Sequence, residues 1–501
     1  MTWPRGVEYK EPFAKLSFGD SSKRNEDNEG WRPAGSLLLL LYLFEAVCPC
    51  VNEPVGTGRG QTACRFAHGF FRFGAVVFVA AAFLFGAPGG AHPLQPLEPC
   101  TGTRRKTIMK KRRNWLAAAL TICTFLGALF APIIGPNVLA APEPYKIGAV
   151  FSITGVGSFL GEPEKKTAEM IRDEINKQGG INGHPVELII YDDESDTTKC
   201  TLAVKKLIKK DEVPVIIGPT RSGESIAVAT VAEESKVPLI SCATSYKIVT
   251  PIESRKWVYK VAGSDAHVVG KMYDYMKGKG VKKVAIMTDS SGYGASGREE
   301  LLRLAPEYGF TIVADERFDP KDTDLTAQMT KIRGTQPQAV VNWSIGPTQI
   351  LAIKTWRDLG MDAIPLFQSH GFGSLKNLEL AGKAAEGVLL PLARVNVGSL
   401  LPDSQPQKKI ILEYTRAYET LYKEPISSFG GHAWDSMHLA MAALKAVGPD
   451  PAKIRDHIEQ TKGFVGMHGI FNFSPQDHCG LSKDDLEMIV VKDGKWALAT
   501  P

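Results

Sequence analysis

The sequence predicts an α/β protein built from two doubly wound lobes, and three observations indicate this fold class. The first is a strand, a Gly-rich turn, a helix and a second strand between Val215 and Thr250. The second is a restart of the same alternation after Val261. The third is a group of late helices that must return to one of the two sheets. Two such sheets predict a two-lobed molecule with a cleft.

The stretch from Val215 to Thr250 carries the clearest candidate site. Val215–Ile217 is typical of a buried strand, and a helix is expected to open at Ser222 after the Gly218-Pro219 turn. The next strand ends in the hydroxyl-rich loop Ser241–Ser245. Both loops leave the carboxyl edge of neighbouring parallel strands, where open sheets bind ligands. With Ser222 as the N-cap, the helix start could bind a carboxylate through free N–H groups and the helix dipole. The alternative is an ordinary capped helix that binds nothing.

The segments before this stretch follow the same alternation. We expect strands at Tyr145–Phe151 and Val186–Tyr191, each followed by a helix, at about 162–177 and 198–210. Asp192 and Asp193 close the second strand, and we expect them to cap a helix, because no further metal-ligand cluster lies nearby.

The segments after Val261 repeat the pattern in a second unit. The expected strands are Val284–Met287, Thr311–Ala314, Ala339–Asn342, Pro365–Gln368, Gly387–Pro391, Gly469–Phe473 and Leu486–Val491. The expected helices include 325–333, 348–359, 407–422, 432–447 and 451–460. We assign residues 141–262 and 392–468 to the first lobe, and 263–391 and 469–501 to the second.

The first 140 residues differ in character from the rest. Residues 1–108 are rich in Gly and Pro and show no order of strands and helices. From Met109, a basic start, an apolar middle and a small-residue exit are typical of a secretory signal peptide at about 109–140. We interpret residues 1–108 as a disordered, non-native upstream extension and expect a periplasmic protein. The alternative is a membrane-anchored protein with a cytoplasmic tail.

Composition and motifs argue against other classes of function. The formal net charge of +5 is not gathered into one basic patch with aromatic residues, so we expect no nucleic-acid partner. Gly292–Gly297 matches G-x-G-x-x-G, with Asp315 and Glu316 at a distance suited to a ribose contact. However, Asp289–Ser291 separates its first glycine from the strand, and export removes the chain from the cytosolic nicotinamide pool. The sequence contains no H-E-x-x-H, G-x-S-x-G or C-x-x-C motif, which favours a non-enzyme.

Histidines and cysteines give no metal site. His432 and His438 lie on one expected helix, but their spacing is wrong for a shared metal face, so we expect neither a metal nor a cofactor. The exported region has three cysteines, and we expect a disulfide between Cys200 and Cys242, within one lobe. Free buried thiols are the alternative.

Six stretches after Tyr145 carry a family resemblance. They read IGAVFSITG…G, INKQGGINGHPVELIIYDDESD, VIIGPTRSGES, VPLISCATS, DSSGYGASG and AGKAAEGVLL. At these spacings the chain resembles the branched-chain amino-acid (Leu/Ile/Val) binding proteins, the type I periplasmic receptors of ABC transporters. The resemblance implies a Venus-flytrap fold whose lobes, joined by a three-segment hinge, close on a small ligand. It also implies a receptor that meets an ABC permease at the membrane, and we expect a monomer.

The resemblance implies a set of ligand-binding residues. Ser222 would take the ligand carboxylate, together with three residues of the following loop, Ala243, Thr244 and Ser245. Aromatic walls would come from Phe159, Tyr293 and Trp343, with Phe429 as a further candidate. Each of these aromatic residues could instead be part of the core or of a lobe surface.

One departure from the family pattern bears on the ligand. The resemblance implies that amino-acid binders hold the ligand ammonium with an acidic residue in the loop after the strand that corresponds to Pro365–Gln368. Here that loop has no carboxylate, and we expect His370 from this loop to be a ligand-binding residue instead. Burying an ammonium without a counter-charge is costly. Asp289 could substitute or could only cap a helix, and Arg221 fits an acidic ligand or is a surface residue.

We therefore expect a receptor for a branched-chain amino acid or a related small carboxylate. The alternatives are a receptor for an aromatic or aliphatic carboxylate without an amino group, a ligand-sensing module of a membrane receptor, and an enzyme.

Overall fold

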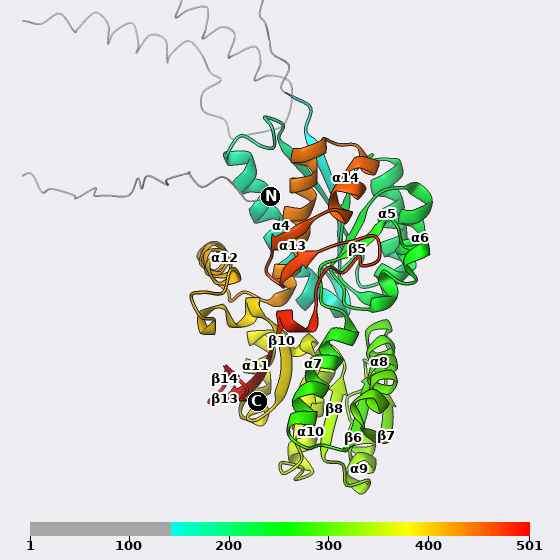
Figure 1. The fold of residues 1–501 in the computed structure, drawn as a ribbon, viewed down its shortest axis with the longest axis vertical. Coiled ribbons are helices and arrows are strands. Elements are labelled where there is room, and N and C mark those ends of the chain that lie inside the picture. Colours follow the sequence, from blue (N-terminus) through cyan, green and yellow to red (C-terminus); the bar gives the residue numbers. More distant parts are fainter. Residues whose placement is uncertain (1–141, 501) are drawn as a thin grey trace, which may run out of the picture. The chain divides into compact units, whose positions relative to one another are not determined.

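The computed structural model describes residues 142–500, which lie within one compact unit, Ala131–Pro501 (Figure 1). The proposed upstream extension and signal peptide lie outside the described residues. The described residues form two α/β lobes, each with its own parallel sheet, as the sequence predicts.

The first lobe contains a five-stranded parallel sheet in the order β2-β1-β3-β4-β5. Its strands are β1 (Tyr145–Phe151), β2 (Val186–Asp192), β3 (Ile216–Ile217), β4 (Leu239–Ser241) and β5 (Val258–Lys260). Helices α4 (Ser158–Lys177), α13 (Ser428–Val447) and α14 (Pro451–Glu459) pack on one face, and α5 (Thr197–Lys209) and α6 (Ser222–Ser235) on the other. Successive side chains of a strand point alternately into the cores on the two faces of the sheet, so the sequence of such a strand is continuously apolar.

The second lobe contains a seven-stranded sheet in the order β14-β13-β10-β9-β8-β6-β7. Five parallel strands are β6 (Lys283–Asp289), β7 (Thr311–Phe318), β8 (Ala339–Trp343), β9 (Leu366–Gln368) and β10 (Leu389–Ala393). β13 (Leu486–Lys492) pairs antiparallel with β10, and β14 (Lys495–Leu498), which the sequence did not predict, pairs antiparallel with β13. Its helices are α7 (Asp265–Gly278), α8 (Gly292–Tyr308), α9 (Thr326–Gly334), α10 (Pro347–Asp358), α11 (Leu375–Ala381) and α12 (Gln407–Tyr422).

Two segments pack differently from the predicted lobe boundaries. β12 (Ile470–Asn472) forms a hairpin with β11 (Lys462–Val465), and Phe471 lies in the core of the first lobe rather than the second. The side chains of α12, predicted for the first lobe, lie mainly in the core of the second. Both segments have the expected secondary structure, but their packing partners are set by contacts distant in sequence. The chain thus passes between the sheets after β5, between α12 and α13, and beyond Leu481.

The predicted disulfide is wrong, because the structure holds Cys200 and Cys242 as separate buried thiols. Cys200 belongs to the core under α5, whereas Cys242 faces the core on the opposite side of the sheet. The sheet itself therefore separates the two sulfur atoms.

The acidic pair Asp192 and Asp193, at the end of β2, does not cap α5, contrary to the prediction. The N-cap is Asp196, whose carboxylate accepts a hydrogen bond from the Lys199 backbone. Asp192 instead accepts bonds from the backbone of Ile153 and Thr154. It thereby fixes the loop after β1.

His438, on α13, predicts a measurable dependence of stability on pH. Its Nδ1 donates to the Trp434 carbonyl at 2.8 Å, and burial lowers its pKa to about 4. Since the unfolded chain takes up this proton near pH 6.5, the stability contribution is complete above pH 6.5 and is lost as the pH falls towards 4. We expect a His438→Gln variant to show a shallower fall in the free energy of unfolding across this window, by up to about 1.4 kcal/mol per pH unit. Urea unfolding at several pH values measures this slope, and an unchanged slope would contradict the assignment.

Candidate ligand-binding site

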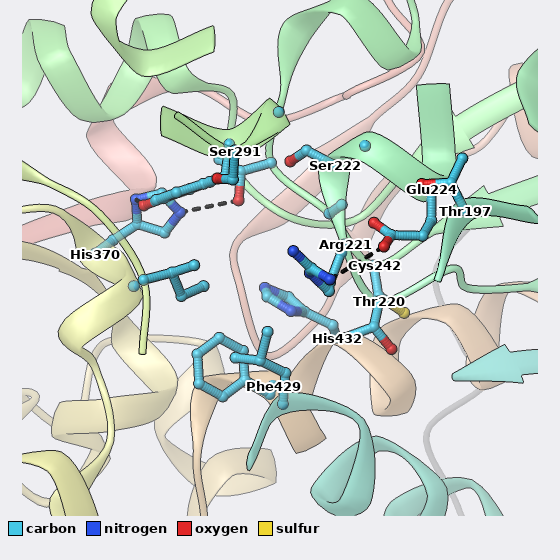
Figure 2. Close-up of a pocket in the computed structure, with 18 residues that line it drawn as sticks. Thr197, Thr220, Arg221, Ser222, Glu224, Cys242, Ser291, His370, Phe429 and His432 are labelled. Carbon is cyan, nitrogen blue, oxygen red and sulfur yellow. Dashed lines mark hydrogen bonds and ion pairs between the residues drawn. The ribbon is translucent and has the colours of Figure 1, made fainter. Parts of the chain in front are cut away.

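A cavity of about 160 Å³ lies where loops of the two lobes meet (Figure 2). An engineered protein cavity of about 150 Å³ admits benzene, so this space suits a small ligand. The first lobe lines it with Leu160, Thr197, Thr220, Arg221, Ser222, Gly223, Glu224, Cys242, Ala243, Thr244, Phe429 and His432. The second lobe lines it with Ser291, Gly292, Tyr293, Ile345, His370 and Gly371.

The start of α6 forms one wall of this cavity, as predicted. The N-cap is Arg221 rather than Ser222, because the helix begins at Ser222 itself. The Ser222 hydroxyl instead accepts a hydrogen bond from the Ser245 backbone N–H at 3.3 Å, which joins the two loops that the sequence singled out. The first turn leaves backbone N–H groups without intrahelical acceptors at the edge of the cavity.

Arg221 reaches the cavity from this helix start and makes an ion pair. Its guanidinium donates to Glu224 at 3.1 Å and to the Ser195 carbonyl at 3.0 Å. Burial raises the pKa of Glu224, and Arg221 acts in the opposite direction. The arginine is therefore a held cationic group rather than a free surface side chain.

Behind this wall, a buried acid fixes Thr220. The Thr220 hydroxyl accepts from the Ser152 backbone at 3.0 Å and donates to Glu164. Glu164 is fully buried, and burial raises its pKa well above the usual value, whereas the hydrogen bond from Thr220 acts in the opposite direction. The hydrogen bonds of Thr220 to Ser152 and Glu164 hold the β3–α6 turn in place.

The loop after β4 supplies Ala243 and Thr244 to the cavity, but Ser245 lies behind it. The Ser245 hydroxyl bonds to Ser296 of α8 at 2.6 Å, and Ser296 donates to Asp265. Burial raises the pKa of Asp265 to about 6. Ser245 thus connects the lobes and has no place in the cavity lining.

A lysine also holds the loop after β4. Lys260 of β5 is fully buried and donates to the Thr244 carbonyl. Burial lowers its pKa. The Thr244 hydroxyl is left to face the second lobe.

Of the predicted aromatic residues, only Tyr293 and the further candidate Phe429 line the cavity. Trp343 is fully buried and stacks behind Tyr293, with ring centroids 5.7 Å apart. Phe159 packs edge-on against Phe429 at 6.1 Å. Trp343 and Phe159 therefore support the wall from behind.

His370 comes from the loop after β9 and meets the first lobe in the cavity (Figure 2). Its Nε2 lies 2.9 Å from the Thr244 hydroxyl, and burial lowers its pKa to about 3. Asp289 is no substitute for the missing acid, because its carboxylate accepts bonds from Ser291 and from the Ile345 backbone. It acts as a support for the α8 start.

Sequence reasoning missed several lining residues. Thr220 and Glu224 flank the predicted helix start, and Ser291 follows a strand. The rule that ligands bind at the carboxyl ends of parallel strands, which identified Ser222, could therefore also have identified these three residues. His432 had no such signal, since it comes from α13, far along the chain. Its ring stacks on His468 with centroids 4.0 Å apart, and His468 Nδ1 lies 2.8 Å from Asp435.

Within residues 142–500, no helix combines the length and apolar character needed to cross a membrane. In the same region, no three His, Cys, Asp or Glu side chains are grouped so that they could hold a metal ion.

Two α/β lobes with a small cavity between their strand-end loops define a ligand-binding receptor. The family model described as "Periplasmic binding protein" matches residues 144–493, so the chain belongs to this family. Members of the family are solute-binding proteins rather than enzymes.

Named relatives and solved structures agree with this assignment. A Leu-, Ile-, Val-, Thr- and Ala-binding protein of Pseudomonas aeruginosa is 24% identical over 63% of this chain and 82% of its own length. An extracellular ligand-binding receptor of Rhodopseudomonas palustris HaA2 is 31% identical, with a TM-score of 0.67 over 71% of this chain and 100% of its own. The substrate-binding protein LivJ of Streptococcus pneumoniae, solved with isoleucine, is 27% identical, with a TM-score of 0.62 over 72% of this chain and 100% of its own.

Proposed function

We propose that this protein is an exported, non-catalytic solute receptor of an ABC transporter. It binds a small carboxylate, such as a branched-chain amino acid, between its lobes and delivers it to the permease from the periplasm. The proposal is supported by relatives that bind leucine, isoleucine and valine, and by a neighbour solved with isoleucine.

The observation that carries the proposal is the donor-rich wall of the first lobe. Ser222 and the start of α6, which has no side-chain cap, lie beside Arg221 in one small cavity. A carboxylate there accepts backbone hydrogen bonds at the positive end of a helix dipole.

A second candidate is a carboxylate without an α-amino group. The second-lobe part of the cavity lining contains no carboxylate, and the one acid of the lining, Glu224, is paired with Arg221. An ammonium in this cavity would lack a counter-charge, which is costly when buried.

Calorimetry on the full chain separates these candidates with a matched pair of ligands. Isoleucine and 3-methylpentanoate share the same carbon skeleton and differ in the α-amino group. Tighter binding of isoleucine supports the amino-acid receptor, and tighter binding of 3-methylpentanoate supports the second candidate. If neither compound nor benzoate binds, a receptor for small carboxylates of this size is contradicted.

A Ser222→Ala variant tests the carboxylate wall. The Ser222 hydroxyl holds the Ser245 backbone and lines the cavity, so its loss should weaken binding of the preferred carboxylate by about 1–3 kcal/mol. Ser235→Ala, at the far end of the same helix, is the matched control and should leave the affinity unchanged. Equal affinities for both variants would mean that the carboxylate is held elsewhere.

A further inference from the structure

Three side chains form a hydrogen-bonded relay across the cavity from the second lobe to the first. The Tyr293 hydroxyl oxygen lies 3.3 Å from His370 Nδ1, and His370 Nε2 lies 2.9 Å from the Thr244 hydroxyl oxygen. All three residues line the cavity. One imidazole therefore joins two hydroxyl groups, and the position of its hydrogen decides which hydroxyl keeps a free hydrogen.

The surroundings of Tyr293 set the direction of this relay. Gly371 lies against the Tyr293 hydroxyl, since a Cβ atom at Gly371 would be 3.3 Å from the phenol oxygen. Burial raises the pKa of Tyr293 well above its usual value, whereas a hydrogen bond from the Gly371 backbone acts in the opposite direction. A backbone N–H only donates, so the Tyr293 oxygen accepts on that side, and its own hydrogen is available to His370 Nδ1.

The state of His370 follows from this contact. The low pKa of about 3 leaves the imidazole neutral at pH 7, with a hydrogen on only one nitrogen. When Nδ1 accepts from Tyr293, the hydrogen is on Nε2, and Nε2 donates to the Thr244 oxygen. The hydrogen of the Thr244 hydroxyl then has no partner within the relay.

We propose that Tyr293 and His370 are positioning residues, which turn the Thr244 hydroxyl hydrogen into the cavity as a donor to the ligand carboxylate. This inference rests on the proposed function, because it names what the second lobe contributes to recognition of the anion. The hydrogens of Tyr293 and His370 are used within the relay, which leaves the Thr244 hydrogen for the ligand. A carboxylate, which only accepts, can take this hydrogen and complete the relay, whereas an ammonium, which only donates, leaves it without an acceptor.

The relay also connects recognition with the contact between lobes. His370 Nε2 and the Thr244 oxygen belong to different lobes, so their bond exists only while these two loops touch. The orientation of the donor and the closed arrangement of the loops are therefore set together.

The first test needs no ligand. In the full chain with ¹⁵N-labelled histidine, long-range ¹H–¹⁵N spectra distinguish imidazoles protonated at Nε2 from those protonated at Nδ1, and a His370→Gln variant identifies the signal of residue 370. We expect the hydrogen on Nε2 at pH 7, and a partial shift to Nδ1 in Tyr293→Phe. A hydrogen on Nδ1 in the unmodified protein would overturn the relay.

The second test is a double-mutant cycle measured with isoleucine, 3-methylpentanoate and benzoate. Thr244→Val and Tyr293→Phe should each weaken binding of the preferred carboxylate, on the order of tenfold and fivefold respectively. Because Tyr293 acts through Thr244, adding Tyr293→Phe to Thr244→Val should weaken binding less than about twofold further. Thr244→Ser, which keeps a hydroxyl, should restore most of the affinity.

Fully additive losses in this cycle would overturn the positioning role. Thermal unfolding of each variant checks that a loss of affinity is not a loss of fold. If the tautomer is as expected but none of the three carboxylates binds, the proposed function fails and the relay's role toward a carboxylate fails with it. If His370 carries its hydrogen on Nδ1 but a carboxylate still binds, the relay is rejected and the proposed function stands.

Discussion

An Asp435→Ala variant should lose about 3–5 kcal/mol of its free energy of unfolding. Asp435 is fully buried on α13, and its carboxylate accepts three hydrogen bonds, from the Met467 N–H at 2.6 Å, the His468 N–H at 3.1 Å and His468 Nδ1 at 2.8 Å. Alanine would leave all three donors buried without an acceptor. Urea unfolding followed by circular dichroism measures the loss.

Asp450 provides the matched control for this variant. Its carboxylate also accepts from backbone N–H groups, at Ala452 and Lys453, but it caps α14 in an exposed position. Asp450→Ala should therefore cost only about 1 kcal/mol. Similar losses for the two variants would mean that water reaches the donors around Asp435.

A Gly292→Ala variant should weaken ligand binding by about 1–3 kcal/mol without lowering the stability of the free protein. Gly292 begins α8 in the second lobe, and a Cβ atom there would lie 3.0 Å from the Cα of Gly223 at the start of α6. The added methyl group would hold these two helix starts apart. Since this contact lies between the lobes, we expect the methyl group to hinder closure of the lobes on the ligand and to leave the packing of both cores unchanged.

Calorimetry with the preferred carboxylate and thermal unfolding without it measure these two effects. Alanine is a better helix former than glycine, so the midpoint of unfolding should stay the same or rise. Gly278→Ala is the control, because a Cβ atom at this helical position meets nothing within 4 Å. Unchanged affinity in Gly292→Ala would show that the two helix starts are not in contact in the bound state.

Much of the fold and part of the site could be predicted from local sequence. The strands of the first lobe are short apolar runs bounded by Gly, Pro and hydroxyl residues, so their ends could be located, and with them Ser222 and Thr244. Loops at the carboxyl ends of neighbouring parallel strands meet at one edge of the sheet, and the loops after β3 and β4 both line the cavity. His370 was also predicted, through its place in the loop after β9.

The remaining residues depended on contacts distant in sequence. Nothing local distinguishes Tyr293, which faces the cavity, from Trp343, which packs behind it. His432 reaches the cavity because α13 returns to the first lobe, a packing choice that no short motif encodes. The same limitation explains the misplaced β12, since an apolar run does not specify which sheet's core it will join.

The way in which the chain alternates between lobes determines when each core can be completed during synthesis. The core of the first lobe includes Ile147 and also Leu481, and the core of the second lobe extends to Trp496. The first core therefore cannot be filled until the chain as far as Leu481 has left the ribosome, and the second until Trp496 has followed. Domains made from one continuous segment fold one after another from the N-terminus, but here the two lobes must be completed late and close together in time.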